Sequence, residues 1–238
     1  MWQEILDKVR EGQEQLDRMG SDWCNGYTAG GGRIFCAKGC RSCCNLVVNA
    51  TFPEARRIAE TVTELQAKRI RTHVERLRAC VQGVTDLKAY LRLHRQQIGF
   101  CPLLDDEGAC GVYLDRPFSC RALLSTKESR WCGADFAALS PAEKSAYIDS
   151  LDRAAVSFPL HYVAATQDEG MRQESTILRE MAVRFGCSLY GNLPLLVHLE
   201  YEHGLSECLS RGGDAAERLL EKEGVASPFL LVLDHRQD

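Results

Sequence analysis

Over most of the chain, hydrophobic residues recur at helical spacing. At the N-terminus they return every three or four positions as far as Met19, which predicts an amphipathic helix that ends at Gly20. Residues 20–35 are then expected to form a loop through Gly30-Gly31-Gly32. A triple glycine can cradle a phosphate, but no Gly-Lys-Ser/Thr follows it, so a flexible linker is favoured over a P-loop.

A capping box marks the start of the next helical block. Thr51-Phe52-Pro53-Glu54 combines a threonine cap, a proline in the first turn and a glutamate three residues after the cap. The apolar pattern continues from there to about Ile98, and we expect breaks at Gly83 and near Leu65. Cys80 falls within the apolar stripe and is interpreted as a small buried residue.

A second capping box, Ser140-Pro141-Ala142-Glu143, opens a helix that is expected to run toward residue 166, with Pro159 kinking or ending it. Gly186 is the predicted stop of the helix that follows. Together with the last two apolar-periodic segments, this gives three C-terminal helices, over residues 170–185, 194–209 and 215–223.

Between these helical regions the pattern is irregular. Residues 45–50 are short, apolar and expected to be extended. Residues 100–114 read as a small hairpin around Asp105-Asp106-Glu107-Gly108, with one cysteine on each arm. Pro117 then starts a short helix over residues 116–121.

The predicted fold class is therefore mostly α: a helical domain with an irregular, cysteine-rich metal-binding lobe and a small hairpin. No alternating segment is long enough for a large sheet. We expect one domain over residues 1–238, with an N-terminal helix and glycine-rich loop (1–35), a cysteine-cluster metal-binding region that includes an inserted helical block at 52–98 (36–132), and a C-terminal helical region (133–238).

Charge and hydropathy exclude several classes of partner. The formal net charge of -4 provides no basic surface for nucleic acid. No run of 18 apolar residues is present, so no membrane span is expected, and charges throughout residues 1–19 argue against a signal peptide. Twelve cysteines in such a chain point to metal ligands in the reducing cytoplasm rather than to secreted disulfides.

Eight of the cysteines lie in two groups separated by the inserted helical block. Thiolates at this density are ligands for zinc or iron, including the cubane 4Fe-4S iron–sulfur cluster. They suffice for one cluster with spare thiols, for two metals, or for a four-plus-three arrangement. The predicted metal ligands are Cys36, Cys40, Cys43, Cys44, Cys101, Cys110, Cys120 and Cys132.

The adjacent Cys43 and Cys44 are expected to diverge and to play different roles. Cys132 is as readily an ordinary buried cysteine as a ligand. Cationic side chains near the thiolates in sequence can offset their charge; these are Arg33, Lys38, Arg41, Arg116 and Arg121.

The histidines provide weaker evidence for metal ligands than the cysteines do. His73 and His94 lie among arginines and are interpreted as surface or boundary residues. His161, beside Pro159, is the histidine most readily assigned as a ligand, although a role outside the metal site is the commoner meaning of such a residue. A single Glu-x-x-His, at residues 200–203, does not make a di-iron site, which needs two.

The two cysteine segments together resemble the YkgJ-like cysteine-cluster family, the putative zinc- or iron-chelating domain. The resemblance rests on Cys-x3-Cys-x2-Cys-Cys followed by Cys-Pro-Leu-Leu, Cys-Gly-Val-Tyr and Arg-Pro-Phe-Ser-Cys-Arg, and it covers about residues 33–125. The chain departs from the family pattern by one extra residue between the first two cysteines and by Arg41, where glycine is common. The resemblance implies metal binding and leaves the reaction open.

Three functions remain in view. The first is an iron–sulfur or other iron protein with a redox or protein-modifying role. The second is a zinc-stabilised, non-catalytic module that presents a surface to a protein partner. The third, implied by the flagellin lysine methylases within the resembling family, is an S-adenosylmethionine-linked protein methylase. No catalytic or cofactor-binding residues can be named from the sequence, and whether the chain is an enzyme stays open.

Overall fold

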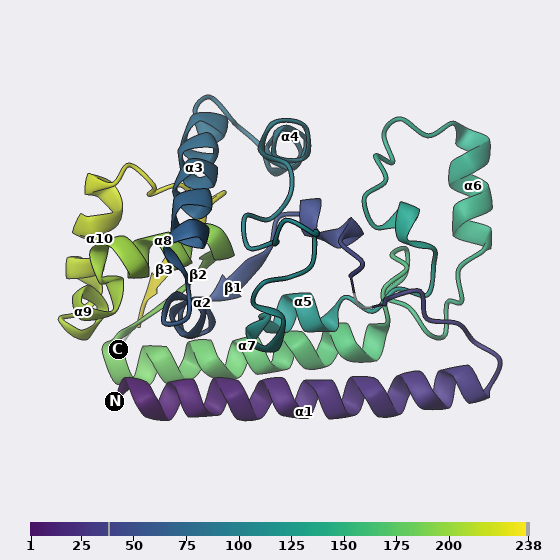
Figure 1. Ribbon diagram of the computed structural model, residues 1–238, viewed down its shortest axis with the longest axis horizontal. Helices are drawn as coiled ribbons and strands as arrows, with labels where there is room; N and C mark the ends of the chain where they lie inside the picture. The colour runs from purple at the N-terminus through teal and green to yellow at the C-terminus, as the bar shows by residue number, and fades with distance from the viewer. Residues whose placement is uncertain (38, 237–238) are drawn as a thin grey trace.

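Two long helices form the base of the molecule. The computed structural model describes residues 1–37 and 39–236. Helix α1 (Trp2–Ala29) and helix α7 (Ala164–Phe185) lie side by side along one edge, and both chain termini lie at the same end of this pair (Figure 1). The buried stripe of α1 includes Ile5, Val9 and Leu16, as its apolar spacing predicts.

The prediction that Gly20 ends the first helix is wrong, because α1 continues for nine more residues to Ala29. Gly20 is buried, and a Cβ there would lie 3.5 Å from Leu124 and 3.6 Å from Thr166. Contacts with α7 and with the chain after residue 122 therefore support the helix across a residue of low helix propensity. The predicted loop is correspondingly shorter and begins at Gly30.

The helical block after residue 51 forms as predicted. Helix α2 (Phe52–Ala59) begins at the capping box, helix α3 (Glu64–Val81) follows a break at residues 60–63, and Gly83 adopts a φ of 81° before helix α4 (Leu87–Leu93). A π-helical turn (His94–Ile98) then leads to the second cysteine segment.

The C-terminal helices differ from the prediction at three points, the first of which is that α7 begins at Ala164 and not at Gly170. Helix α6 (Pro141–Asp149) ends well before residue 166, and residues 150–163 turn back so that Leu151, Ala155 and Val156 pack with Tyr147 in a small second core. The predicted helix over 194–209 is two helices, α8 (Leu193–His203) and α9 (Leu205–Ser210). They are separated by Gly204 in the left-handed conformation. Helix α10 is Gly213–Lys222.

A small antiparallel sheet of order β1-β2-β3 completes the main core. Its strands are β1 (Asn49–Thr51), β2 (Cys187–Asn192) and β3 (Leu231–His235). The register pairs Ala50 with Gly191, where a Cβ would lie 2.5 Å from the Leu230 carbonyl oxygen. Helices α2 and α3 both pack on α8, so the sheet and these helices bury one continuous apolar core (Figure 1).

The remaining elements are short and carry the cysteines. They are the 3-10 turns Ser42–Asn45, Tyr113–Asp115 and Ser129–Trp131 and helix α5 (Phe118–Ala122). The predicted hairpin is a turn closed by a single antiparallel bridge between Leu104 and Cys110. The mostly helical fold class is thus confirmed. Every helix in the described ranges is too short or too polar to cross a membrane.

Candidate metal centre

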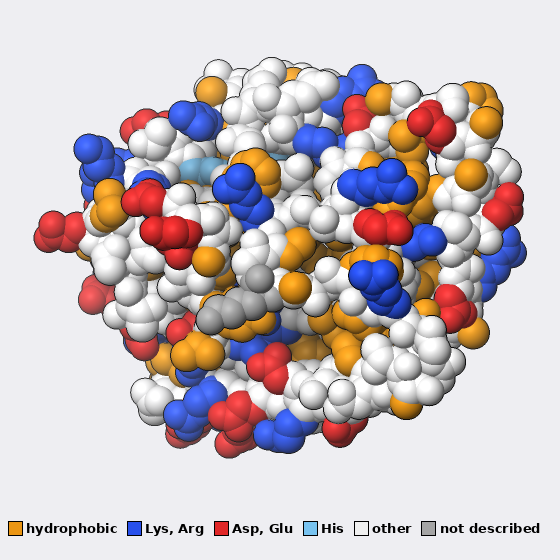
Figure 2. Space-filling view, turned by 45° about the vertical axis from the view of Figure 1, so that its right-hand side comes forward, with side chains coloured by type: hydrophobic (Ala, Val, Ile, Leu, Met, Phe, Trp, Pro, Cys, Tyr) orange, Lys and Arg blue, Asp and Glu red, His pale blue; other side chains and the backbone are white. Residues whose placement is uncertain are grey.

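All eight cysteines predicted as ligands line one cavity of about 270 Å³. They reach it from the segment 36–44, from residues 101–120 and from the turn before Cys132. In Figure 2, orange side chains, a class that includes cysteine, gather in the hollowed middle of the face, with Lys and Arg side chains around it. The cysteines that do not line the cavity are Cys24, Cys80, Cys187 and Cys208, and Cys80 is buried as predicted.

Backbone hydrogen bonds join the separated cysteine segments. The N–H of Cys101 donates to the carbonyl of Cys44 at 2.7 Å, which connects the two halves of the motif directly. At the other end, the N–H of Phe35 donates to the carbonyl of Ser125 at 2.9 Å, and the N–H of Ser125 donates to Cys36 Sγ at 3.2 Å. The first cysteine segment is therefore held at both ends by later parts of the chain.

A buried carboxylate positions the helix that carries Cys120. Glu54 is fully buried, and its two oxygens accept hydrogen bonds from the Thr51 N–H and hydroxyl and, across the fold, from the Phe118 N–H at 2.6 Å. The Ser119 hydroxyl donates to the Asn49 carbonyl at 2.7 Å. The first turn of α5 is thereby tied to both α2 and β1.

Four of the thiols form an inner group, which consists of Cys43, Cys101, Cys110 and Cys120. Burial is the largest cause that raises the pKa of Cys101, Cys110 and Cys120, and repulsion from the neighbouring Cys43 thiolate raises the pKa of each further. The shift brings the pKa of Cys101 to about 12, and that of Cys120 lies well above its usual value. Thiols this desolvated stay protonated at neutral pH unless a cation takes the place of their protons.

Three further thiols form an outer group, which consists of Cys36, Cys40 and Cys132. Cys36 and Cys40 are exposed residues, whereas Cys132 is buried. Desolvation of the cavity-facing sulfur raises the pKa of Cys36 to about 11, and the next causes that raise it are Cys132, Cys43 and Cys40. Cys43 thus borders both groups, and Cys44, the eighth cysteine of the cavity, lies next to it on the same turn.

The expectation that Cys43 and Cys44 diverge is wrong. Both lie on the 3-10 turn Ser42–Asn45 and line the same cavity. A hydrogen bond with the Cys44 thiol is the largest cause that raises the pKa of Cys43, ahead of burial. The tight turn brings the two sulfurs together, and both thiols are free rather than joined in a disulfide.

Of the cationic side chains considered, Arg116 and Arg121 line the cavity. Arg116 lowers the pKa of three inner thiols and so favours their thiolate forms. Arg121 is engaged by the carbonyls of Leu114 and Arg116 and by Asp17. Arg33 and Arg41 stack on Phe35 and Phe100, and Lys38 lies outside the described residues.

The interpretation of His73 and His94 as surface residues is also wrong. Both are buried behind the inner group, where they border a small cavity together with Cys101. Burial is the main cause that lowers the pKa of each to about 4, so both imidazoles are neutral. Their arginine neighbours in sequence lie on the other faces of the helices, which a linear pattern does not reveal.

His161 is buried, and its Nε2 lies 3.5 Å from Cys132 Sγ. Its Nδ1 lies 2.9 Å from the Tyr147 hydroxyl oxygen. Burial lowers the pKa of His161 to about 4, which leaves the ring neutral. Of the histidines considered in the sequence, His161 is thus the one that the structure places against a cysteine of the cavity.

The donor set fits a thiophilic metal such as zinc or iron. Four thiolates about 2.3 Å from one zinc ion lie about 3.8 Å from each other. Within residues 1–37 and 39–236, no three cysteine sulfurs all lie within 4.8 Å of one another. In the same part of the chain, the group of possible metal-ligating side chains whose donor atoms do all lie within 4.8 Å of one another is the exposed trio Asp214, Glu217 and His235. The sulfurs thus surround the cavity instead of converging on a single point.

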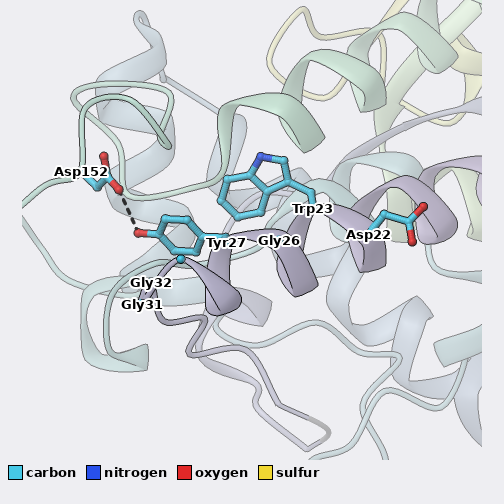
Figure 3. Close-up of a pocket in the computed structure, with 8 residues that line it drawn as sticks. Asp22, Trp23, Gly26, Tyr27, Gly31, Gly32 and Asp152 are labelled. Atoms are coloured by element: carbon cyan, nitrogen blue, oxygen red, sulfur yellow. Dashed lines mark hydrogen bonds between the residues drawn. The ribbon is translucent and has the colours of Figure 1, made fainter.

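A larger, more open groove of about 670 Å³ lies at the C-terminal end of α1 and is lined by none of the described cysteines. Trp23 and Tyr27 stack there at 4.7 Å, and the Tyr27 hydroxyl donates to Asp152 at 3.1 Å (Figure 3). The triple glycine lines this groove beside Asp22 and Asp152. Two carboxylates repel a phosphate, which agrees with the absence of a P-loop pattern.

Comparison with known proteins supports metal binding. Residues 35–136 match the family model described as "CxxCxxCC: Putative zinc- or iron-chelating domain", which confirms the family resemblance and spans the eight cysteines of the cavity. No curated protein and no solved structure matches the chain.

Proposed function

We propose that the cavity holds an iron–sulfur cluster, ligated by the inner group Cys43, Cys101, Cys110 and Cys120, and that the protein acts in redox chemistry. The observation that carries this proposal is the arrangement of sulfurs around a cavity, with no three mutually within 4.8 Å. A cubane cluster takes one cysteine per iron, so its ligands are spread around a multi-atom core. A single zinc ion would need them much closer together.

The surroundings of the cavity support a redox centre. Apolar side chains line it beside the thiols, including Val48, Leu103 and Leu193. Such a shell limits water access and tunes the reduction potential of a cluster. Four thiolates on a dicationic cluster leave a charge of about -2, which Arg116 partly offsets from the cavity wall. The twelve unpaired cysteines suit the reducing cytoplasm expected from the sequence.

The test is the metal content of anaerobically purified protein. We expect a brown protein with broad visible absorbance, iron by elemental analysis and acid-labile sulfide in equal amount to the iron. Cys120→Ser should lose most of this iron and sulfide. Cys24→Ser, a half-buried cysteine on α1 that does not line the cavity, is the matched control and should keep both.

Two results would contradict the proposal in different ways. A colourless protein that carries zinc and no sulfide would leave metal binding intact but would overturn the iron–sulfur assignment. It would favour the zinc-stabilised module. A wild-type protein that retains no metal under anaerobic conditions, and binds none when iron and sulfide are supplied, would overturn both the metal-binding function and the iron–sulfur assignment.

A further inference from the structure

We propose that His161 is a metal ligand and that it binds the same ion as Cys132, at the outer side of the cavity. The inference rests on the proposed metal-binding function and adds an imidazole nitrogen to a donor set that consists of thiols. Cys132 lines the cavity, and His161, on the segment between α6 and α7, contacts Cys132 from outside the cavity lining.

The distance between the two donor atoms matches a shared metal ion. Typical zinc bonds of about 2.3 Å to sulfur and about 2.0–2.1 Å to nitrogen, at a tetrahedral angle, place the two ligand atoms about 3.6 Å apart. Nε2 of His161 and Sγ of Cys132 are 3.5 Å apart. Both residues are at least nine-tenths buried, so neither atom is free to turn toward bulk water.

The other ring nitrogen of His161 has the partner that metal-bound histidines usually have. Nδ1 lies 2.9 Å from the Tyr147 oxygen. When Nδ1–H donates to this oxygen, the tautomer is fixed with the Nε2 lone pair facing Cys132. The Tyr147 ring is itself held by Trp131 and Phe136, each with its ring centroid 4.7 Å away. The imidazole is therefore oriented before any metal binds.

The backbone around His161 connects it to a second outer thiol. The His161 carbonyl accepts hydrogen bonds from the N–H and the hydroxyl of Thr126, each at 3.0 Å. The preceding residue, Ser125, donates its N–H to Cys36 Sγ at 3.2 Å. Cys36 and His161 are thus attached to adjacent residues of one segment. Within the described residues, however, the Cys36 sulfur, the Cys132 sulfur and a His161 nitrogen do not all lie within 4.8 Å of one another, so Cys36 can join the ion only if its segment moves inward.

X-ray absorption at the metal edge tests this without any substitution. The wild-type, anaerobically purified protein should show scattering from about one imidazole per molecule in addition to sulfur. His161→Gln should remove that scattering and should release the outer metal to a chelator at least tenfold faster. Tyr147→Phe keeps the ring but removes the partner of Nδ1, and should weaken retention of this metal about 10–100-fold.

His198→Gln is the matched control, because His198 is also buried but packs against His203 and not against a cysteine of the cavity, and it should behave as wild type. Circular dichroism of each variant checks that it is folded. Metal-loaded wild-type protein with sulfur scattering alone, or His161→Gln with unchanged spectrum and release rate, would overturn the role of His161 while leaving the proposed function standing. Wild-type protein without metal would overturn the proposed function itself.

Discussion

The buried carboxyl group of Glu54 offers the sharpest test of how the fold positions its cysteines. Its two oxygens receive backbone N–H groups from both Thr51 and Phe118, and the second of these holds the helix that carries Cys120. We predict that Glu54→Gln destabilises the fold and loosens α5, because glutamine has one acceptor oxygen where the carboxyl group has two.

The size of the effect follows from the hydrogen bonds. With glutamine at position 54, one backbone N–H must face the side-chain NH₂ group in a site that excludes water. Losing one hydrogen bond and leaving one buried donor unpaired costs about 2–4 kcal/mol in the free energy of unfolding. For a chain of this length, about 2–4 °C of melting temperature corresponds to each kcal/mol, so we expect a decrease of about 10 °C.

The chain contains its own control for this experiment. Glu143 forms the same capping box at the start of α6, where its carboxylate accepts from the N–H and hydroxyl of Ser140. It is exposed, however, and has no third partner across the fold among the residues that the structure describes. Water can replace the lost bond there, so Glu143→Gln should cost about 1 kcal/mol or less. Thermal unfolding followed by circular dichroism measures both variants. Equal decreases in melting temperature would refute the reasoning.

Four further outcomes are expected. Burial raises the pKa of Glu174 to about 8, so the folded state holds a proton that the unfolded state has lost above pH 4.5, and stability should fall as pH rises from about 4.5 to 8. Melting temperatures measured across this pH range should fall less steeply for Glu174→Gln than for the wild type. An equal slope for the two proteins would contradict the assignment of the pH dependence to Glu174. Gly20→Ala should raise the free energy of unfolding by about 0.5–1 kcal/mol, since the new methyl group meets its neighbours at ordinary contact distance. Gly191→Ala should lower the free energy of unfolding, because the Leu230 carbonyl oxygen lies 2.5 Å from the added carbon. Denaturant titration compares the two variants. A destabilised Gly20→Ala variant together with a stabilised Gly191→Ala variant would refute the packing argument. Removal of metal by a chelator should lower the melting temperature of wild-type protein, and an unchanged value would show that metal does not stabilise the fold.

Features of the chain that depend on neighbouring residues were predictable. The capping boxes at Thr51 and Ser140 start helices, and Gly83 and Gly186 end helical segments in conformations that favour glycine. The abundance of cysteine in two segments was enough to predict a soft-metal donor set and the residues that line its cavity. These signals act within one or two helical turns, so they survive without knowledge of the fold.

What depends on packing between distant residues had to come from the tertiary structure. The contacts of Gly20 with Leu124 and Thr166, about 100 residues or more away in sequence, carry α1 through a residue that weakens helices in isolation. The same kind of long-range contact places His161 against Cys132 and separates the inner thiols from the outer ones. The sequence by itself thus determined which donor atoms the protein has. Only the fold decided which of them meet, because the distance between two side chains is set by the packing of whole elements and not by their separation along the chain.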